Sequence, residues 1–323
     1  MSVLILNHEE VERLLDMPGC MAAMEEALLG LARGEFQLPL RPILRPPGAS
    51  NLLGMMPTHR AGERPLYGLK TVAVFPDNPT RGLDPHQGTV TLYDGTSGEV
   101  IAIMNATPIT AIRTAAVSGV ATRALARDDV RELAVVGAGH QAHPHIAAML
   151  EARPFERIRI ASRSYESAER LASEWPIATA VETAEEAVHD AEVVCTVTSS
   201  AEPVVLGKWL RPGAHVNAVG ACFPHMRELD SAAVAGASLF VDRRESAENE
   251  AGDYLIPLRE GAIAEGHIRA ELGEVLAGTA PGRTSDDEIT IFESLGLAVE
   301  DLAAAEYLER RAVESGAGAT IEF

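Results

Sequence analysis

Cysteine, lysine and long apolar runs are all scarce in this chain of 323 residues. Three scattered cysteines, at positions 20, 195 and 222, form neither a disulfide framework nor a zinc-ligand spacing, so we expect a reduced, cytoplasmic protein. No apolar run approaches the roughly 20 residues of a membrane-spanning helix. The first residues also lack the basic region and cleavage site expected of a secretory signal. Lysine occurs only at positions 70 and 208, which makes each one worth attention.

Acidic residues greatly outnumber basic ones. The chain has 47 Asp and Glu against 27 Lys and Arg, a formal charge of −20 at pH 7. A surface of that sign repels nucleic acid and anionic lipid, so we expect neither nucleic acid nor a membrane as a partner. Solubility is the simplest interpretation of the acidity. The length suggests two domains with sizeable cores.

A short apolar run, Leu133–Val136, leads directly into a glycine-rich turn. Its lack of alternation is typical of a strand covered on both faces, as in a parallel sheet. Gly137, Gly139 and Ala142 follow with G-x-G-x-x-A spacing, which suits a tight turn, a nearby pyrophosphate and a closely packed helix. The predicted helix contains His145–Leu150, and its free N–H groups would face the phosphates. A plain tight turn is the alternative, but the place between strand and helix favours a dinucleotide site.

Strands and helices alternate from residue 131 onward, which predicts a doubly wound parallel sheet of the Rossmann type. The acidic segment Glu245–Asp253 is interpreted as a solvated loop. The predicted strands are Leu133–Val136, Arg157–Ala161, Ala178–Val181, Glu192–Thr198, Ala214–Val219 and Ser238–Asp242.

The first hundred residues predict a smaller α+β unit. Asn7 and Glu10 have the spacing of a capping box at a helix start. A long helix, Thr107–Arg127, leads into the dinucleotide unit, and the alanine-rich last helix, Ala298–Val313, is expected to return to the first domain. We therefore predict a domain of residues 1–112 and 300–323 and a Rossmann domain of residues 113–299. Other elements expected in the first domain are the helix Met21–Leu31 and the strands Tyr67–Phe75, Gly88–Tyr93 and Glu99–Asn105.

The end of the second Rossmann strand bears on the form of the cofactor. NAD-binding units place an acidic residue there, about 20 residues past the glycines, to bind the ribose hydroxyls. This chain instead has Ser162, Arg163 and Ser164, which could hold a 2′-phosphate through charge-assisted hydrogen bonds. NADP(H) is therefore favoured. NAD(H) stays possible, because Arg163 could simply stack on the adenine.

Several motifs together resemble the ornithine cyclodeaminase/mu-crystallin family. The resemblance runs from about residue 41 to residue 313, and it is specific for the family rather than for a substrate. The matching segments are Gly68–Lys70, Thr110–Ala116, Gly137–Ala142, Asn217–Ala221, Arg227–Asp230 and Phe292–Gly296.

The resemblance implies a fold and a chemistry. It implies a Rossmann domain plus a substrate and dimerisation domain built from both chain ends, with two copies joined through the latter as a homodimer. It also implies chemistry at a carbon that bears an amino or imino group next to a carboxylate. The cyclodeaminases of the family use bound NAD transiently, whereas ketimine, pyrroline-carboxylate and iminosuccinate reductases and alanine dehydrogenase carry out net hydride transfer.

Residues that match the family's substrate site can be named from the resemblance. Arg41 matches the arginine that meets the substrate carboxylate, a task suited to a guanidinium fork, although Arg45 could serve instead. Lys70 matches the active-site lysine, which could bind the carboxylate or protonate the nascent amine; a surface lysine is the alternative. His86 could line the site or be a solvated loop residue. The substrate-binding candidates are Arg41, Lys70, Met56, His86 and Cys222.

The cofactor candidates follow the same resemblance. Arg113 and Thr114 match residues that bind the cofactor phosphates, with an interdomain salt bridge as the alternative for Arg113. Residues that end the fourth and fifth Rossmann strands would lie at the sheet edge where ligands bind. The complete set is Arg113, Thr114, Gly137, Gly139, His140, Gln141, Ser162, Arg163, Ser164, Thr198, Ser199, Val219, Gly220, Ala221 and Ser294.

One departure from the family pattern matters for the reaction. The cyclodeaminases place an aspartate two residues before the proline of this motif, where this chain has Cys222. A buried, inert thiol is favoured there over a proton donor. Asp230 matches a different, structural position. Three histidines near the glycine turn, at positions 140, 143 and 145, lack a second cluster, so we expect no metal.

Residues and resemblance together predict an oxidoreductase. We expect NAD(P)H-dependent reduction of a small 2-imino acid (a ketimine) to the amino acid, or the reverse dehydrogenation, with Lys70 as the catalytic residue. One alternative is an ornithine-cyclodeaminase-type lyase that uses NAD catalytically. Another is a non-catalytic NADP-binding protein, as in crystallins.

Overall fold

The computed structural model describes residues 2–322, which divide into two compact units. The first unit runs to Arg113 and resumes at Leu297, and the second is Thr114–Gly296. Arg113 therefore belongs to the first unit, one residue beyond the expected boundary, because it pairs with acidic residues of the last helix. The second boundary falls three residues earlier than expected, because that helix begins at Ala298.

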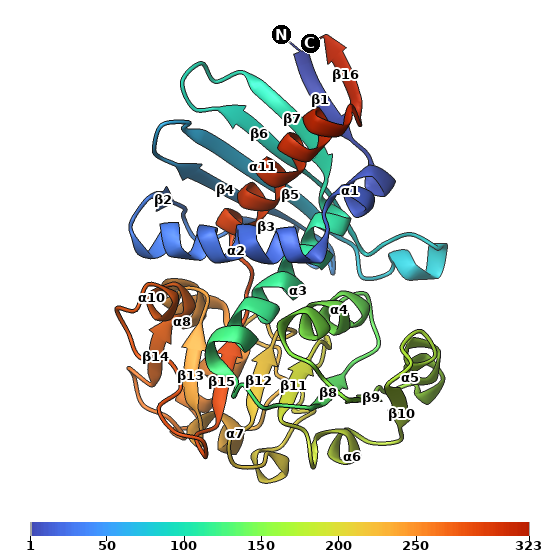
Figure 1. Cartoon of the computed structure of the whole chain (residues 1–323), viewed down its shortest axis with the longest axis vertical. Helices are drawn as coiled ribbons and strands as arrows, with labels where there is room; N and C mark the ends of the chain where they lie inside the picture. Colours follow the sequence, from blue (N-terminus) through green and yellow to red (C-terminus); the bar gives the residue numbers. More distant parts are fainter. Residues whose placement is uncertain (1, 323) are drawn as a thin grey trace. The chain divides into compact units, whose positions relative to one another are not determined.

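The first unit is built on one mixed sheet, with strand order β16-β1-β7-β6-β5-β4-β2 and β3 paired to β4 (Figure 1). Helices α2 and α11 pack against each other, and α11 crosses β4, β5 and β6. As expected, the last helix returns to this unit. Its elements are β1 (Ser2–Leu6), α1 (His8–Leu14), α2 (Met17–Ala32), β2 (Phe36–Gln37), β3 (Ile43–Leu44), β4 (Leu52–Arg60), β5 (Leu66–Val74), the 3₁₀ turn η1 (Asn78–Arg81), β6 (His86–Asp94), β7 (Val100–Asn105), the start of α3 (Ala106–Leu125), α11 (Ala298–Ser315) and β16 (Ala319–Glu322).

The two faces of this sheet differ in burial. Along the middle of β4, β5 and β6 the even-numbered residues face α11 and are buried, whereas none of the odd-numbered residues is buried. Gly68 allows the close approach of the helix, because a Cβ at this position would lie 3.0 Å from the Leu302 side chain. The uncovered face keeps large apolar side chains in solvent, with Leu53 37% and Tyr67 49% exposed.

The capping box at the start of the chain is confirmed. The side chain of Asn7 accepts from the N–H of Glu10 at 3.0 Å, and the Glu10 carboxylate accepts from the N–H of Asn7 at 2.9 Å. Two otherwise unpaired N–H groups of α1 are satisfied in this way, which fixes where the helix begins.

The second unit is a Rossmann sheet of eight parallel strands, in the order β10-β9-β8-β11-β12-β15-β13-β14 (Figure 1). From β8 the chain continues to β9 and β10 on one side and then to β11 and β12 on the other, so the point where strand order reverses lies between β8 and β11. Its elements are β8 (Glu132–Val136), α4 (Ala142–Ala152), β9 (Arg157–Ala161), α5 (Tyr165–Ala172), β10 (Ala178–Val181), α6 (Ala184–Val188), β11 (Val193–Thr196), η2 (Gly207–Trp209), β12 (His215–Ala218), α7 (Ser231–Ala235), β13 (Ser238–Val241), α8 (Arg244–Glu250), α9 (Gly252–Arg259), β14 (Ile268–Glu271), α10 (Leu272–Leu276) and β15 (Thr290–Glu293).

One expectation for this unit is wrong. The segment Glu245–Asp253 is not a solvated loop, because α8 and the start of α9 occupy it and Asp253 is buried. Strands β14 and β15 were not predicted. The run Thr290–Glu293 ends in a glutamate, a residue type that is usually exposed, so the sequence did not indicate a buried strand there. In the structure the run lies fully buried between β12 and β13. Within the described residues, no helix combines the length and apolar character needed to cross a bilayer.

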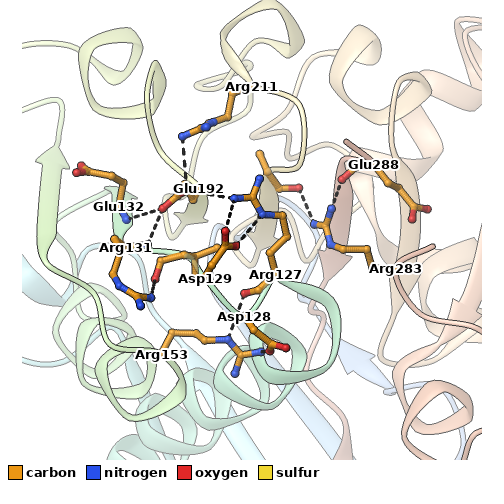
Figure 2. A network of polar contacts seen from close by, with 12 residues as sticks. Arg127, Asp128, Asp129, Arg131, Glu132, Arg153, Glu192, Arg211, Arg283 and Glu288 are labelled. Carbon is orange, nitrogen blue, oxygen red and sulfur yellow. Dashed lines mark hydrogen bonds and ion pairs between the residues drawn. The ribbon is translucent and has the colours of Figure 1, made fainter. Parts of the chain in front are cut away.

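Charged side chains anchor the amino-terminal edge of this sheet (Figure 2). The Glu192 carboxylate accepts from the backbone N–H groups of Arg131 and Glu132, at 2.5 and 3.1 Å. The guanidinium of Arg283 donates to the carbonyl of Leu125, in the last turn of α3, at 2.8 Å. These contacts satisfy backbone groups that a helix end and a strand start would leave unpaired. The opposite edge of the sheet is left to the loops that follow the strands.

Candidate functional site

Lys70 lies in the middle of β5, on the sheet face covered by α11. Its side chain is 2% exposed, and its Nζ lies 3.0 Å from Oδ1 of Asp301, which is equally buried. Met56 is paired with Lys70 across β4 and β5, so its side chain lies on the same covered face. The surface-lysine interpretation is thereby excluded, since the ammonium group is desolvated and held by one carboxylate.

A second buried cation completes the cluster around Asp301. Arg113 of α3 donates through Nε to Oδ1 of Asp301 at 3.1 Å and through Nη1 to Glu300 at 2.6 Å. Two cations and two carboxylates therefore share this buried volume. The pKa of Lys70 is lowered to about 8. Burial is the largest cause, Asp301 opposes it by raising the pKa, and the positive charges of Arg113 and Arg41 add to the lowering. An amine whose pKa lies near neutrality is suited to proton transfer.

The other substrate candidates of this unit are placed differently. Arg41 is half-buried in the segment between β2 and β3, and its charge acts on Lys70. His86 is exposed at the start of β6, where it pairs with Val74, four residues along β5 from Lys70. That offset corresponds to roughly 13 Å along a strand, so the structure does not bring His86 to Lys70.

Arg113 has a clear set of partners. The resemblance assigns it to cofactor phosphates, whereas the structure pairs it with Glu300 and Asp301 of its own unit. Its neighbour Thr114 is buried at the start of the second unit. A role in phosphate binding stays a prediction for both residues.

The glycine turn has the backbone that a dinucleotide requires. Gly137 adopts φ 120°, and a Cβ at this position would lie 2.7 Å from the carbonyl of Val197. A Cβ on Gly139 would meet no atom within 4 Å, so this side of the turn faces open space. Helix α4 begins at Ala142, directly after the turn. A phosphate could therefore approach both the backbone and the helix N-terminus, and the turn fits the cofactor.

Among the described residues, two of the buried polar atoms that lack a hydrogen-bond partner belong to cofactor candidates near the carboxyl edge of the sheet. They are Oε1 of Gln141, which precedes α4, and Oγ of Ser294, which follows β15. Buried polar atoms are nearly always paired, so an unpaired atom calls for a missing partner. Both residues are cofactor candidates, and a bound dinucleotide could supply the partner. His140, in the same turn, is exposed.

Of the three residues that follow β9, some have side chains that a ligand could reach. Arg163 is exposed and Ser162 is half-buried. Ser164 is the N-cap of α5, and its hydroxyl accepts from the N–H of Ser167 at 3.3 Å. Its hydroxyl is thus already in use, and Arg163 is the residue best placed to meet a 2′-phosphate.

The loops after β11 and β12 meet at one buried carboxylate that sequence reasoning did not single out. Glu228 accepts hydrogen bonds from the N–H of Thr198 and the N–H of Gly220, both at 2.6 Å. It also accepts from the hydroxyl of Thr196 at 2.8 Å. Burial raises the pKa of Glu228, while these hydrogen bonds oppose that shift. Its sequence signal is the acidic residue within the family motif Arg227–Asp230.

The similarity to known proteins runs through the whole chain. The sequence profile of the ornithine cyclodeaminase/mu-crystallin family matches residues 1–316. The chain belongs to this family. A Delta(1)-pyrroline-2-carboxylate reductase of Bacillus cereus is 37% identical to it, with 99% of this chain and 100% of that protein covered. The mouse ketimine reductase mu-crystallin is 38% identical, with 93% and 94% covered.

Two solved structures of relatives share the fold. One is the Thermococcus litoralis Delta(1)-pyrroline-2-carboxylate reductase in complex with NADH and L-proline, with a TM-score of 0.95, 37% identity, and 99% of this chain and 100% of that chain covered. The other is an archaeal alanine dehydrogenase dimer with bound NAD, with a TM-score of 0.94, 34% identity and both chains fully covered. A Rossmann unit joined to a smaller α+β unit is thus confirmed.

Within this family member, the remaining candidates lie where the strands of the second unit end. Val219 and Ala221 are buried, Ser199 is exposed, and Cys222 is half-buried. Asp230 caps α7, and its carboxylate accepts from the N–H of Ala233 at 2.8 Å, which is a structural role.

The histidines near the glycine turn have different surroundings. His145 is buried, and its ring nitrogens lie 2.7 Å from the carbonyl of Gln141 and 3.1 Å from the hydroxyl of Ser118. Burial lowers the pKa of His145 to about 4, so the ring is neutral. His143 packs against Trp175. Across residues 2–322, no three His, Cys, Asp or Glu side chains come together in a way that could hold a metal ion.

Proposed function

We propose that this protein is an NAD(P)H-dependent oxidoreductase that reduces a small 2-imino acid to the amino acid, or catalyses the reverse dehydrogenation. The observation that carries the proposal is Lys70, an almost fully buried amine with a pKa lowered to about 8 in a member of this family. The fit of the Gly137–Ala142 turn to a dinucleotide supports it. When bound, the nicotinamide supplies or accepts the hydride at the carbon of the C=N bond.

The residues of this chain would do the rest. Arg41 binds the substrate carboxylate through its guanidinium fork, with Lys70 as a second cation. Lys70, or a water that it orders, donates the proton that the nitrogen gains when the C=N bond becomes C–NH. Asp301 keeps the ammonium form of Lys70 populated, because its carboxylate raises a pKa that burial alone would push lower. The thioether of Met56 forms part of the apolar wall beside the lysine.

The relatives support a reductase over a lyase. The names of the Bacillus cereus and mouse relatives are those of imine reductases, and the Thermococcus litoralis structure contains NADH with L-proline. Cys222 stands where a cyclodeaminase would have an aspartate, which argues against cyclodeamination. We also propose a cytoplasmic location, because three scattered cysteines suit a reducing compartment.

We propose NADP(H) as the favoured cofactor. Arg163 is exposed at the end of β9, where an acidic residue would bind the ribose of NAD. The structures of relatives with NADH and NAD make NAD(H) a realistic alternative for this chain. Turnover measured with both cofactors under the same conditions decides between the two forms.

We also propose a homodimer formed through the uncovered face of the first unit's sheet. That face carries exposed Leu53 and Tyr67, and exposed apolar patches on folded proteins commonly mark interaction sites. An archaeal relative with 34% identity is described as a dimer. A second copy of this chain would bury these side chains without using α2 or α11.

A spectrophotometric assay tests the proposed function. The protein is mixed with NADPH or NADH and with pyruvate plus ammonia, glyoxylate plus methylamine, or a cyclic ketimine, and loss of the reduced cofactor is followed. K70M should abolish turnover, and K208M, which removes the other lysine, should leave it unchanged. If no imine consumes either cofactor while ornithine releases ammonia, the reductase proposal fails.

A further inference from the structure

Glu228 joins the ends of two neighbouring Rossmann strands through its side chain. Its Oε1 accepts from the N–H of Thr198, two residues after β11, at 2.6 Å. Its Oε2 accepts from the N–H of Gly220, two residues after β12, at 2.6 Å, and from the hydroxyl of Thr196 at 2.8 Å. One fully buried carboxylate therefore fixes the distance between two loops that both contain cofactor candidates.

The backbone of Glu228 is held just as firmly. Its carbonyl accepts from the N–H groups of Val204 and Val205 at 2.7 and 2.9 Å. Its own N–H donates to the carboxylate of Asp253, in α9, at 3.0 Å. The side chain thus projects from a fixed base, and any change in what it can accept is transmitted to the two loops.

The arrangement matches the acceptor capacity of a carboxyl group, because both oxygens accept. All three partners are donors, and they converge on both oxygens of Glu228. An amide in place of this carboxyl group would turn its NH₂ group toward the N–H of Thr198 or of Gly220, and that backbone N–H would lose its acceptor. A side chain at Gly220 is also excluded, because a Cβ there would lie 2.0 Å from the carbonyl of Thr198 and 2.6 Å from the carboxylate carbon of Glu228.

We propose that Glu228 is a positioning residue for the nicotinamide cofactor. By holding the Thr198 and Gly220 loops together, it shapes the carboxyl edge of the sheet on which the dinucleotide lies, without touching the reacting atoms. The inference rests on the proposed function, since it presupposes that the cofactor binds along these loops.

Glu293 offers a matched control. It is a second buried glutamate on the sheet of the same unit, 1% exposed at the end of β15, and neither of its carboxylate oxygens has a hydrogen-bond partner. The electrostatic influence of Glu228 reaches it, so the two carboxylates share one environment. Replacing Glu293 by glutamine is the same substitution as at Glu228, but it releases no loop N–H.

The test compares E228Q with E293Q in the full chain. NADH and NADPH dissociation constants are measured by fluorescence titration, together with Tm and the KM values for cofactor and imino acid. We expect E228Q to weaken cofactor binding by about tenfold or more, with the KM for the imino acid unchanged, because losing a buried acceptor has a cost of that order. E293Q should bind the cofactor as the wild type does.

Several outcomes would overturn the inference. One is that E228Q binds the cofactor with the wild-type dissociation constant, and another is that E228Q and E293Q weaken binding equally. If E228Q does not fold, E228D replaces it, since it keeps the carboxylate but shortens the side chain by one methylene. An E228D dissociation constant for the cofactor within about twofold of the wild-type value would also overturn the inference. A wild-type protein that binds neither NADH nor NADPH would instead refute the proposed function.

Discussion

The amino group of Lys70 lies 3.0 Å from Oδ1 of Asp301, a residue 231 positions further along the chain, and both side chains are 2% exposed. Asp301 also accepts from Nε of Arg113 at 3.1 Å. One carboxylate therefore contacts both buried cations, so its removal should destabilise the fold.

We expect D301N to lower the free energy of unfolding by about 3 kcal/mol or more, because it leaves buried cations without their shared carboxylate. E306Q is the control on the same helix, since it breaks the more exposed contact of Glu306 with Arg60 and should cost about 1 kcal/mol or less. Urea denaturation of both variants measures the difference. Equal losses of unfolding free energy in D301N and E306Q would show that the buried pair of Lys70 and Asp301 contributes no more to stability than the exposed one.

The titration of Lys70 can be observed directly, because K208R leaves it as the sole lysine. NMR of lysine labelled with ¹³C at Cε should show a pKa of about 8, below the ordinary 10.5, because burial disfavours the charge. The folded state then loses this proton before the unfolded chain does, so the contribution of Lys70 to stability grows as the pH rises from about 8 to about 10.5. In D301N the pKa should fall further. A midpoint near 10.5 would contradict the desolvated site.

Glu293 should make the second unit sensitive to alkali. Burial and the nearby charges of Asp253, Glu228 and Asp242 raise the pKa of Glu293 well above its ordinary value. The folded state then keeps a proton that the unfolded chain releases, so stability is greatest in acid and is lost as the pH rises through the raised pKa. We expect E293Q to be more stable than wild type at pH 8, by about 1 kcal/mol or more.

Denaturant unfolding at several pH values measures this effect. The stability difference between E293Q and wild type should shrink toward pH 5 and widen toward pH 9. A difference that does not vary with pH would show that Glu293 is ionised in the folded protein.

The proposed dimer depends on apolar side chains of the uncovered sheet face. Tyr67→Lys introduces a charge on that face, where burial against a second copy would be costly, and we expect it to convert the dimer to a monomer. Val313→Lys is the control, because Val313 is 71% exposed on α11 and lies outside this face. Light scattering after size-exclusion chromatography reports the mass. Two dimeric variants would place the interface elsewhere.

The form of the cofactor should respond to Arg163. We expect R163A to lower kcat/KM for NADPH by about tenfold to a hundredfold and to change kcat/KM for NADH little, since only NADPH carries the 2′-phosphate. R170A, on the following helix α5, serves as a surface control. A parallel loss with both cofactors would indicate stacking on the adenine instead.

Features that depend on neighbours in the chain could be predicted from the sequence. The capping box of Asn7 and Glu10 needs only a spacing of three residues, and the Gly137–Ala142 turn needs only small residues where the backbone bends or a ligand approaches. Strands β8 to β13 were also predicted, because each contains a short apolar run and strands alternate with helices along the chain. Lys70 stood out in the same way, as one of two lysines and set in an apolar strand.

What the sequence could not determine are the features that join distant segments. The pairing of Lys70 with Asp301 and the convergence of two loops on Glu228 exist only once strands and helices have packed, since each links residues whose spacing has no local meaning. Strand β15 was missed for the same reason. Its last residue, Glu293, is of a type that is usually exposed, and only the packing of the neighbouring strands buries it. Turns and helix caps depend on residues that are close in the sequence, whereas the environment of a buried charge depends on the whole fold.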